Sequence, residues 1–294
     1  MGGMAPAGQE DHAGLDDLNE ETSTPSAYQR LLGVLKASTR VWLALAMFAA
    51  AGLMAAVAVS RMSTTLARGG RVPATQVSSS TPSGPHWRQV GVSVLGRSIL
   101  AASFGSGERR VLVIGGIHGS EFGSDVAEQF AAWLAANPGA IPSGTRVDVV
   151  ACANPDGRAA GKKGNAHGVN LNGNFPSSNW KQQRYLTSTA GPSPGSEPET
   201  QALINLLDGG YVRVVSLHSQ GGIIDYDGPG GEALAKQVSS ASGLPVKKLG
   251  PPQAYAGSLG TYVPEHFGIP VLTVELLSRT MTSAVQAGLL TSVR

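Results

Sequence analysis

The stretch VLVIGGIHGSEFGSD, residues 111–125, is the segment from which the fold of this chain is predicted. Its first four residues are all apolar, as in a strand that is buried on both faces. Two glycines follow, and then His118 and Glu121 stand three positions apart, where the strand should give way to a helix. This pair is either a polar loop residue followed by a helix-start acid, or two ligands of one metal cation.

Similar apolar runs recur along the chain and predict the rest of the architecture. Further strands are expected at residues 147–151, 212–217 and 271–276, and helices at 120–136 and 196–210. Strands that alternate with helices are typical of an α/β fold. We therefore predict a mixed, mostly parallel sheet with helices on both faces.

Two local patterns add detail to this prediction. Residues 90–105 alternate between apolar and polar and are expected to form an antiparallel edge pair, with its turn at residues 95–97. Ser196 and Glu199 stand at capping-box spacing, so the second helix is expected to begin there with reciprocal side-chain caps.

Chemically reactive side chains stand at the ends of several predicted strands. His218 follows the strand at 212–217, and Glu275 lies in the apolar strand TVEL, where an unpaired carboxylate is costly to bury. Because the loops at the carboxyl ends of parallel strands build the site in such sheets, these residues should meet His118 and Glu121. Two imidazoles and one carboxylate leave a tetrahedral zinc open to water. The expected cofactor is one Zn²⁺ ion, with Glu275 as the general base.

Composition excludes some functions and leaves others open. The formal net charge is +2 over 294 residues and the basic residues are scattered, so no nucleic-acid surface is expected. The single cysteine, Cys152, cannot form an internal disulfide and should be buried. No pattern identifies a protein partner.

The N-terminal third of the chain predicts a membrane location. Residues 1–40 are expected to be a disordered cytoplasmic tail, and residues 61–85 a linker rich in Ser, Thr, Gly and Pro. Residues 41–60 contain no charge and have the length of a transmembrane helix, which is either a retained anchor or a cleaved signal, with the anchor favoured. Equal numbers of positive residues flank the segment on its two sides, so they do not indicate its orientation. The expected function does: the folded domain, residues 86–294, is expected outside the cytoplasm.

Six motifs in the folded region occur in the order of a known family. They are GRSI, GGIHGSEFGS, NPDGRAAGKKGNAHGVNLNGNFP, GSEPET, SLHS and TVEL. From about Trp87 to Arg294 the chain resembles the zinc carboxypeptidase family, the relatives of carboxypeptidase A, and most of all its bacterial murein peptide amidase branch. The resemblance implies a peptide substrate, such as a murein peptide cleaved at its γ-D-glutamyl to diaminopimelate bond. It also implies zinc ligation by His118, Glu121 and His218, with Glu275 as the base.

The resemblance also assigns residues around the metal, with two departures. Asn170 replaces the aspartate that accepts a hydrogen bond from a zinc-bound histidine, which implies a weaker metal site. Gly173 replaces the arginine that grips the substrate's terminal carboxylate, so weak recognition of a free C-terminus is expected, and Gly173→Arg should improve it. Lys163, with Lys162 as the alternative, stands in for the arginine that polarises the scissile carbonyl.

Three further residues are implied to contact substrate. They are Asn172, Ser219 and Tyr255, with Tyr262 as an alternative to Tyr255. Two other functions remain open from the sequence: an N-acyl amino acid deacylase of the aspartoacylase type, and a degenerate peptide-binding domain without catalysis.

Overall fold

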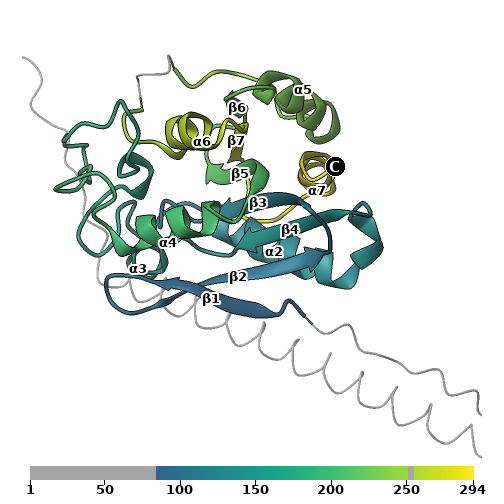
Figure 1. The fold of residues 1–294 in the computed structure, drawn as a ribbon, viewed down its shortest axis with the longest axis horizontal. Helices are drawn as coiled ribbons and strands as arrows, with labels where there is room; N and C mark the ends of the chain where they lie inside the picture. Colours follow the sequence, from purple (N-terminus) through teal and green to yellow (C-terminus); the bar gives the residue numbers. More distant parts are fainter. Residues whose placement is uncertain (1–83, 251–254) are drawn as a thin grey trace, which may run out of the picture. The chain divides into compact units, whose positions relative to one another are not determined.

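A computed structural model describes residues 84–250 and 255–294, which fold around one mixed sheet (Figure 1). The sheet has seven strands in the order β1-β2-β4-β3-β5-β7-β6. The strands are β1 (Trp87–Val92), β2 (Ser98–Gly105), β3 (Arg109–Gly115), β4 (Thr145–Val150), β5 (Tyr211–Ser219), β6 (Ile224–Asp227) and β7 (Val271–Leu276).

The four central strands, β4, β3, β5 and β7, are parallel, and both edges are antiparallel. The α/β architecture and the antiparallel β1-β2 pair are therefore confirmed. The opposite edge was not predicted: β6 pairs antiparallel with β7 and has only four residues, too short for a clear alternation.

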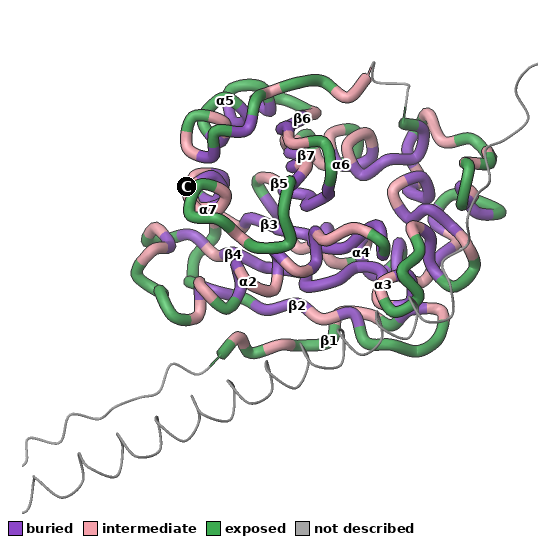
Figure 2. Tube along the Cα trace, turned by 180° about the vertical axis from the view of Figure 1, so that it is seen from behind, coloured by how far each residue is buried: buried purple, intermediate pink, exposed green. Residues whose placement is uncertain are grey.

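Helices cover both faces of the sheet. They are α2 (Gly123–Ala136), α3 (Pro155–Ala160), α4 (Pro198–Leu207), α5 (Gly231–Ser242), α6 (Leu259–Phe267) and α7 (Ser283–Ser292), with single 3-10 turns at Pro138–Ala140 and Leu171–Gly173. Side chains of α2, α5 and α7 belong to one apolar cluster, and those of α4 and α6 belong to a second cluster on the other face. Figure 2 shows the central strands buried between these layers, whereas β1 is largely exposed or intermediate.

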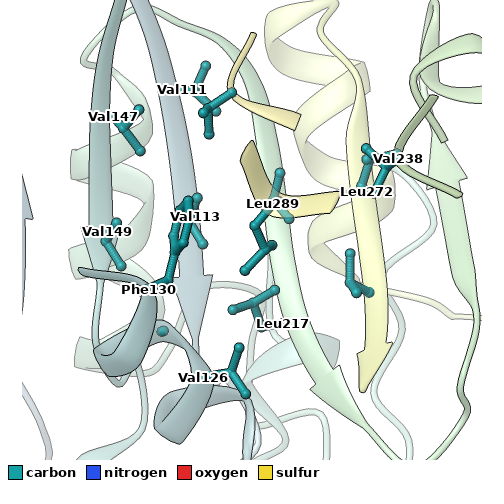
Figure 3. Close-up of a cluster of buried hydrophobic side chains, with 14 of the residues drawn as sticks. Val111, Val113, Val126, Phe130, Val147, Val149, Leu217, Val238, Leu272 and Leu289 are labelled. Carbon is teal, nitrogen blue, oxygen red and sulfur yellow. The ribbon is translucent and has the colours of Figure 1, made fainter. Parts of the chain in front are cut away.

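The apolar run of β3 contributes side chains to the hydrophobic clusters on both faces of the sheet. Val111 and Val113 join the cluster that contains Phe130 of α2 (Figure 3), and Leu112 and Ile114 join the opposite cluster. All four of these β3 side chains are fully buried. A strand buried on both faces must be apolar at every position, which explains the unbroken run.

Close backbone packing places the start of α2 on the end of β5. The helix begins at Gly123, so Glu121 lies in the loop before it and not within the predicted first turn. A Cβ atom on Gly123 would overlap the carbonyl oxygen of Leu217. Glycine at this position therefore lets the loop that carries Glu121 approach the strand that carries His218.

The capping-box prediction for α4 is wrong. The N-cap is Glu197, and it makes no side-chain cap bond. Glu199 is fully buried and instead accepts hydrogen bonds from the Val94 backbone amide at 3.0 Å and from Asn165 Nδ2 at 2.9 Å. These long-range partners tie the first turn of α4 to the β1-β2 turn, which outweighs a local cap.

Other predictions concern the N-terminal residues and the cysteine. No helix among residues 84–250 and 255–294 is long and apolar enough to cross a membrane. The predicted tail at residues 1–40 and transmembrane segment at residues 41–60 lie outside the described residues, as does the predicted linker at residues 61–85 except for its last two residues. Cys152 is buried just after β4, and burial raises the pKa of its thiol to about 11, as befits a packing role.

Candidate active site

Three candidate metal ligands meet at the carboxyl edge of the sheet. His118 follows β3, Glu121 precedes α2, and His218 is the penultimate residue of β5. Because β3 and β5 are parallel neighbours with Gly115 opposite Leu217, their carboxyl ends lie together. One ligand atom from each residue lies within 4.8 Å of the others.

The hydrogen bonds around His118 determine which ring nitrogen faces the cluster. Asn170 Oδ1 accepts from the Asn172 backbone amide at 3.1 Å, so the nearby His118 Nε2, 2.9 Å away, must carry its proton and donate as well. A neutral His118 then has a bare lone pair on Nδ1. That lone pair faces Glu121 Oε1 at 2.7 Å and His218 Nδ1 at 3.2 Å.

Burial keeps this lone pair unprotonated. His118 is 6% exposed, and desolvation lowers the pKa of its imidazole to about 4, although the hydrogen bond with Glu121 opposes the shift. Burial also disfavours the charge on Glu121, yet hydrogen bonds with His118 and His218 hold the pKa of its carboxyl well below the usual range. With its proton on Nε2, His118 presents a lone pair on Nδ1 to a Glu121 oxygen at 2.7 Å, and two such acceptors repel unless a proton or a metal cation lies between them. The donor set therefore fits a divalent metal such as zinc.

Neighbouring groups orient the ligands. The Ser219 backbone amide donates to Glu121 Oε2 at 3.2 Å, and Ser216 Oγ lies 3.0 Å from His218 Nε2. Asn170 holds His118 through a neutral amide oxygen where the resembled family has a carboxylate. The predicted contact is thus present, without the negative charge that would make His118 a stronger ligand.

Glu275 lies beside the cluster because of strand register. In the parallel β5-β7 pair, His218 and Glu275 are directly opposite each other, so both side chains project from the same face. Burial raises the pKa of Glu275, while the positive potential of His218 opposes the shift. A half-buried carboxyl with a raised pKa is suited to accept a proton from water near neutral pH.

These residues line a cavity of about 430 Å³. Its wall includes the three candidate ligands, Glu275, and the predicted Lys163, Asn170, Asn172, Ser219 and Tyr255. Every site residue predicted from the sequence is therefore brought to one cavity. The two alternatives lie elsewhere: Lys162 is exposed and outside the lining, and Tyr262 is 5% exposed, stacked on Phe175.

The loop that carries Lys163 is held against the metal-ligand loop. The Lys163 carbonyl accepts from the Gly119 amide and from Asn154 Nδ2, both at 3.2 Å. These bonds hold the loop of the half-buried Lys163 against the loop of His118, and both residues line the cavity. Its ammonium group can therefore approach an oxygen atom of a substrate bound beside the cluster.

Gly173 does not have room for an arginine. A Cβ atom on Gly173 would overlap the hydroxyl oxygen of Tyr185, which itself lines the cavity. Gly173→Arg alone would therefore have to displace the Tyr185 hydroxyl group before its guanidinium group could reach a carboxylate. No arginine among the described residues lines the cavity.

Among the cavity residues that sequence reasoning missed are Tyr185, Asp225 and Asp227. The two aspartates stand two apart in β6 and so project to the same face, with Asp225 opposite Thr273 of β7. Lys248 Nζ bridges them at 2.8 Å from Asp225 and 3.0 Å from Asp227. The sequence IDYD carries this alternation, but a four-residue strand gives too weak a signal.

Comparisons with known proteins agree with this geometry. The profile of the family described as zinc carboxypeptidase matches residues 74–239, more than half of the chain. Murein peptide amidase A of Escherichia coli K12 is 39% identical over 140 residues, covering 42% of this chain and 54% of that protein. The match thus spans about half the length of this relative.

Two further relatives are covered over more of their length. Murein peptide amidase A of Vibrio campbellii is 32% identical over 202 residues, which cover 63% of this chain and 77% of that protein. The crystal structure of murein-tripeptide amidase from Escherichia coli O157 superposes with a TM-score of 0.58 at 30% identity, over 70% of this chain and 92% of that one.

Proposed function

This chain belongs to the zinc carboxypeptidase family, and on that premise we propose that it is a zinc-dependent hydrolase that cleaves an amide bond in a murein peptide. The bond proposed is the one between γ-D-glutamate and diaminopimelate. The observation that carries the proposal is the cluster of His118, Glu121 and His218 with Glu275 in register beside it.

The proposed mechanism assigns each side chain one task. A zinc ion held by His118, Glu121 and His218 would polarise the scissile carbonyl and lower the pKa of water toward about 7. Glu275 accepts a proton from the attacking water and returns it to the leaving amine. Lys163 places an ammonium group near the carbonyl oxygen and stabilises the negative charge that develops there.

The far wall of the cavity supports a substrate that carries an amino group. Asp225, Asp227 and Lys248 together carry one net negative charge. Gly260 and Asp227 both line the cavity, and a Cβ atom on Gly260 would overlap Asp227 Oδ2, so glycine leaves the space that this oxygen occupies. The free amino group of diaminopimelate matches the net negative charge of this wall.

Incubation of the full-length, zinc-loaded protein with L-Ala-γ-D-Glu-meso-diaminopimelate tests the proposal. Mass spectrometry should detect the dipeptide and free diaminopimelate, and Glu275→Gln should yield neither. Cleavage of N-acyl amino acids alone would identify a deacylase instead. A zinc-loaded protein that binds the peptide and cleaves nothing would be a binding domain without catalysis.

We also propose that residues 41–60 anchor the chain in a membrane, with the hydrolase domain outside the cytoplasm. The uncharged segment and a substrate in the cell wall support this orientation. A reporter fused after Arg294 that is active only outside the cytoplasm is the expected result. Activity of a reporter that functions only in the cytoplasm would contradict it.

A further inference from the structure

Gly173 and Tyr185 form a matched pair in the cavity wall. Gly173 is buried in the 3-10 turn, and the space in which its side chain would lie holds the Tyr185 hydroxyl group. The loop of Tyr185 is fixed by its backbone, since the Tyr185 amide donates to the Ser188 carbonyl at 2.8 Å. The missing side chain at position 173 is thus replaced by a hydroxyl group from another loop.

The hydrogen bonding of Tyr185 directs its proton to a ligand. Gln183 Nε2 donates to the Tyr185 hydroxyl oxygen, which therefore acts as an acceptor in that bond. Among residues 84–250 and 255–294, no acceptor takes the hydroxyl proton. Tyr185 can therefore donate to an oxygen atom in the cavity that it lines.

Asn172, next to Gly173 in the chain, presents a second neutral donor. Its Oδ1 atom accepts from the Leu259 backbone amide at 2.9 Å, which fixes the orientation of the side-chain amide. The Nδ2 group has no hydrogen-bond acceptor within the described part of the chain. Lys163 is the one lysine or arginine among the described residues that line the cavity, and its loop lies by the metal-ligand cluster.

We propose that Tyr185 and Asn172 form an uncharged subsite that binds an oxygen atom of the substrate residue on the leaving-group side of the scissile bond. The inference rests on the proposed function, because the subsite lies in the same cavity as the candidate metal ligands. Two neutral donors bind both a carboxylate oxygen and an amide oxygen and favour the charged acceptor only moderately, whereas an arginine pairs with the carboxylate as a full ion pair through two charge-assisted bonds. The enzyme should thus accept a leaving residue whose α-carboxyl group is free or amidated.

Binding measurements separate this subsite from catalysis. The probes are L-Ala-γ-D-Glu-meso-diaminopimelate and its C-terminal carboxamide, titrated calorimetrically into full-length, zinc-loaded Glu275→Gln protein. Tyr185→Phe in this background should weaken binding of the carboxamide by about 2- to 13-fold, the range of one neutral hydrogen bond, and binding of the free acid by at least as much, because its acceptor is charged. Tyr262→Phe makes the same chemical change in the core and should leave both affinities unchanged.

Kinetics in the active background provide the second readout. Tyr185→Phe should raise KM by a similar factor with kcat within about twofold, since the subsite holds the substrate and takes no part in proton transfer. Unchanged affinity for both probes, or a loss of kcat without a change in KM, would overturn the proposal. So would a wild-type preference of more than about 100-fold for the free acid, which requires a cation.

The steric pairing predicts a non-additive double mutant. Gly173→Arg alone should weaken the binding of both probes, because the new side chain displaces Tyr185. In the double variant, Gly173→Arg with Tyr185→Ala, the smaller alanine leaves room for the guanidinium group. The double variant should prefer the free acid by about tenfold or more, with an affinity that falls as salt is added. Equal behaviour of the single and double variants would refute the pairing. Differential binding without turnover would instead refute the proposed hydrolysis and leave the subsite intact.

Discussion

Replacing Asn170 by aspartate should strengthen zinc binding by restoring a charged partner for His118. The change keeps the size of the side chain and the 2.9 Å contact with His118 Nε2, while the acceptor gains a negative charge. A hydrogen bond to a charged group contributes about 1.5–3 kcal/mol, against about 0.5–1.5 kcal/mol for a neutral one. The difference of about 1–1.5 kcal/mol corresponds to roughly tenfold in affinity.

Solvent screening should not remove this effect. His118 and Asn170 are 6% and 7% exposed, so little water lies between them. Asn170→Ala deletes the contact and should weaken zinc binding by about 10- to 100-fold, as is usual for a group that orients a metal ligand. The three proteins should therefore rank in the order aspartate, asparagine, alanine.

Competition with a chromophoric zinc chelator at pH 7 measures the three dissociation constants. Asn137→Asp makes the same chemical change at an exposed helix end outside the cavity, and should leave zinc affinity unchanged. Circular dichroism establishes that each variant is folded. An Asn170→Asp protein that binds zinc no more tightly than the wild type would refute the role assigned to this contact.

Three further outcomes are expected. Glu121→Ala and His218→Ala should each abolish stoichiometric zinc by elemental analysis, and full zinc in both would contradict the ligand assignment. Glu275→Gln should retain zinc and lose kcat by at least about 100-fold in a peptide assay, because it removes the proton acceptor. Asp148→Asn should lower the free energy of unfolding, measured by urea denaturation at pH 7, by about 3 kcal/mol, because it leaves Arg110 without the buried carboxylate charge that it contacts at 2.9 Å. Burial raises the pKa of Asp148, but hydrogen bonds outweigh burial and lower this pKa in the folded state. The ionised carboxyl group therefore stabilises the folded state above the unfolded pKa, and this stabilisation is lost as pH falls through the folded pKa. The difference in the free energy of unfolding between the Asp148→Asn variant and the wild type should therefore become smaller below about pH 4.

The residues at strand ends were predictable from the sequence because they depend on local periodicity and on one topological rule. The run at residues 111–114 predicts a strand buried on both faces, and Val111 and Leu112 do lie in opposite clusters. Parallel strands end at one edge, so His118 and His218 could be expected to meet although 100 residues separate them. Glu275 was identifiable because a carboxylate in an apolar strand needs a compensating environment.

Only the tertiary structure decided the contacts made by irregular segments. Ser196 and Glu199 have the spacing of a local cap, yet Glu199 bonds to Asn165 and to the backbone of Val94, because a buried carboxylate is stabilised most where several donors converge. The position of the Tyr185 hydroxyl group in the space beside Gly173 is likewise a contact between irregular segments that lie apart in the sequence. Loops have no repeat from which facing residues can be deduced, so whether a glycine leaves a vacancy or admits a distant hydroxyl group depends on how separate chain segments pack in three dimensions.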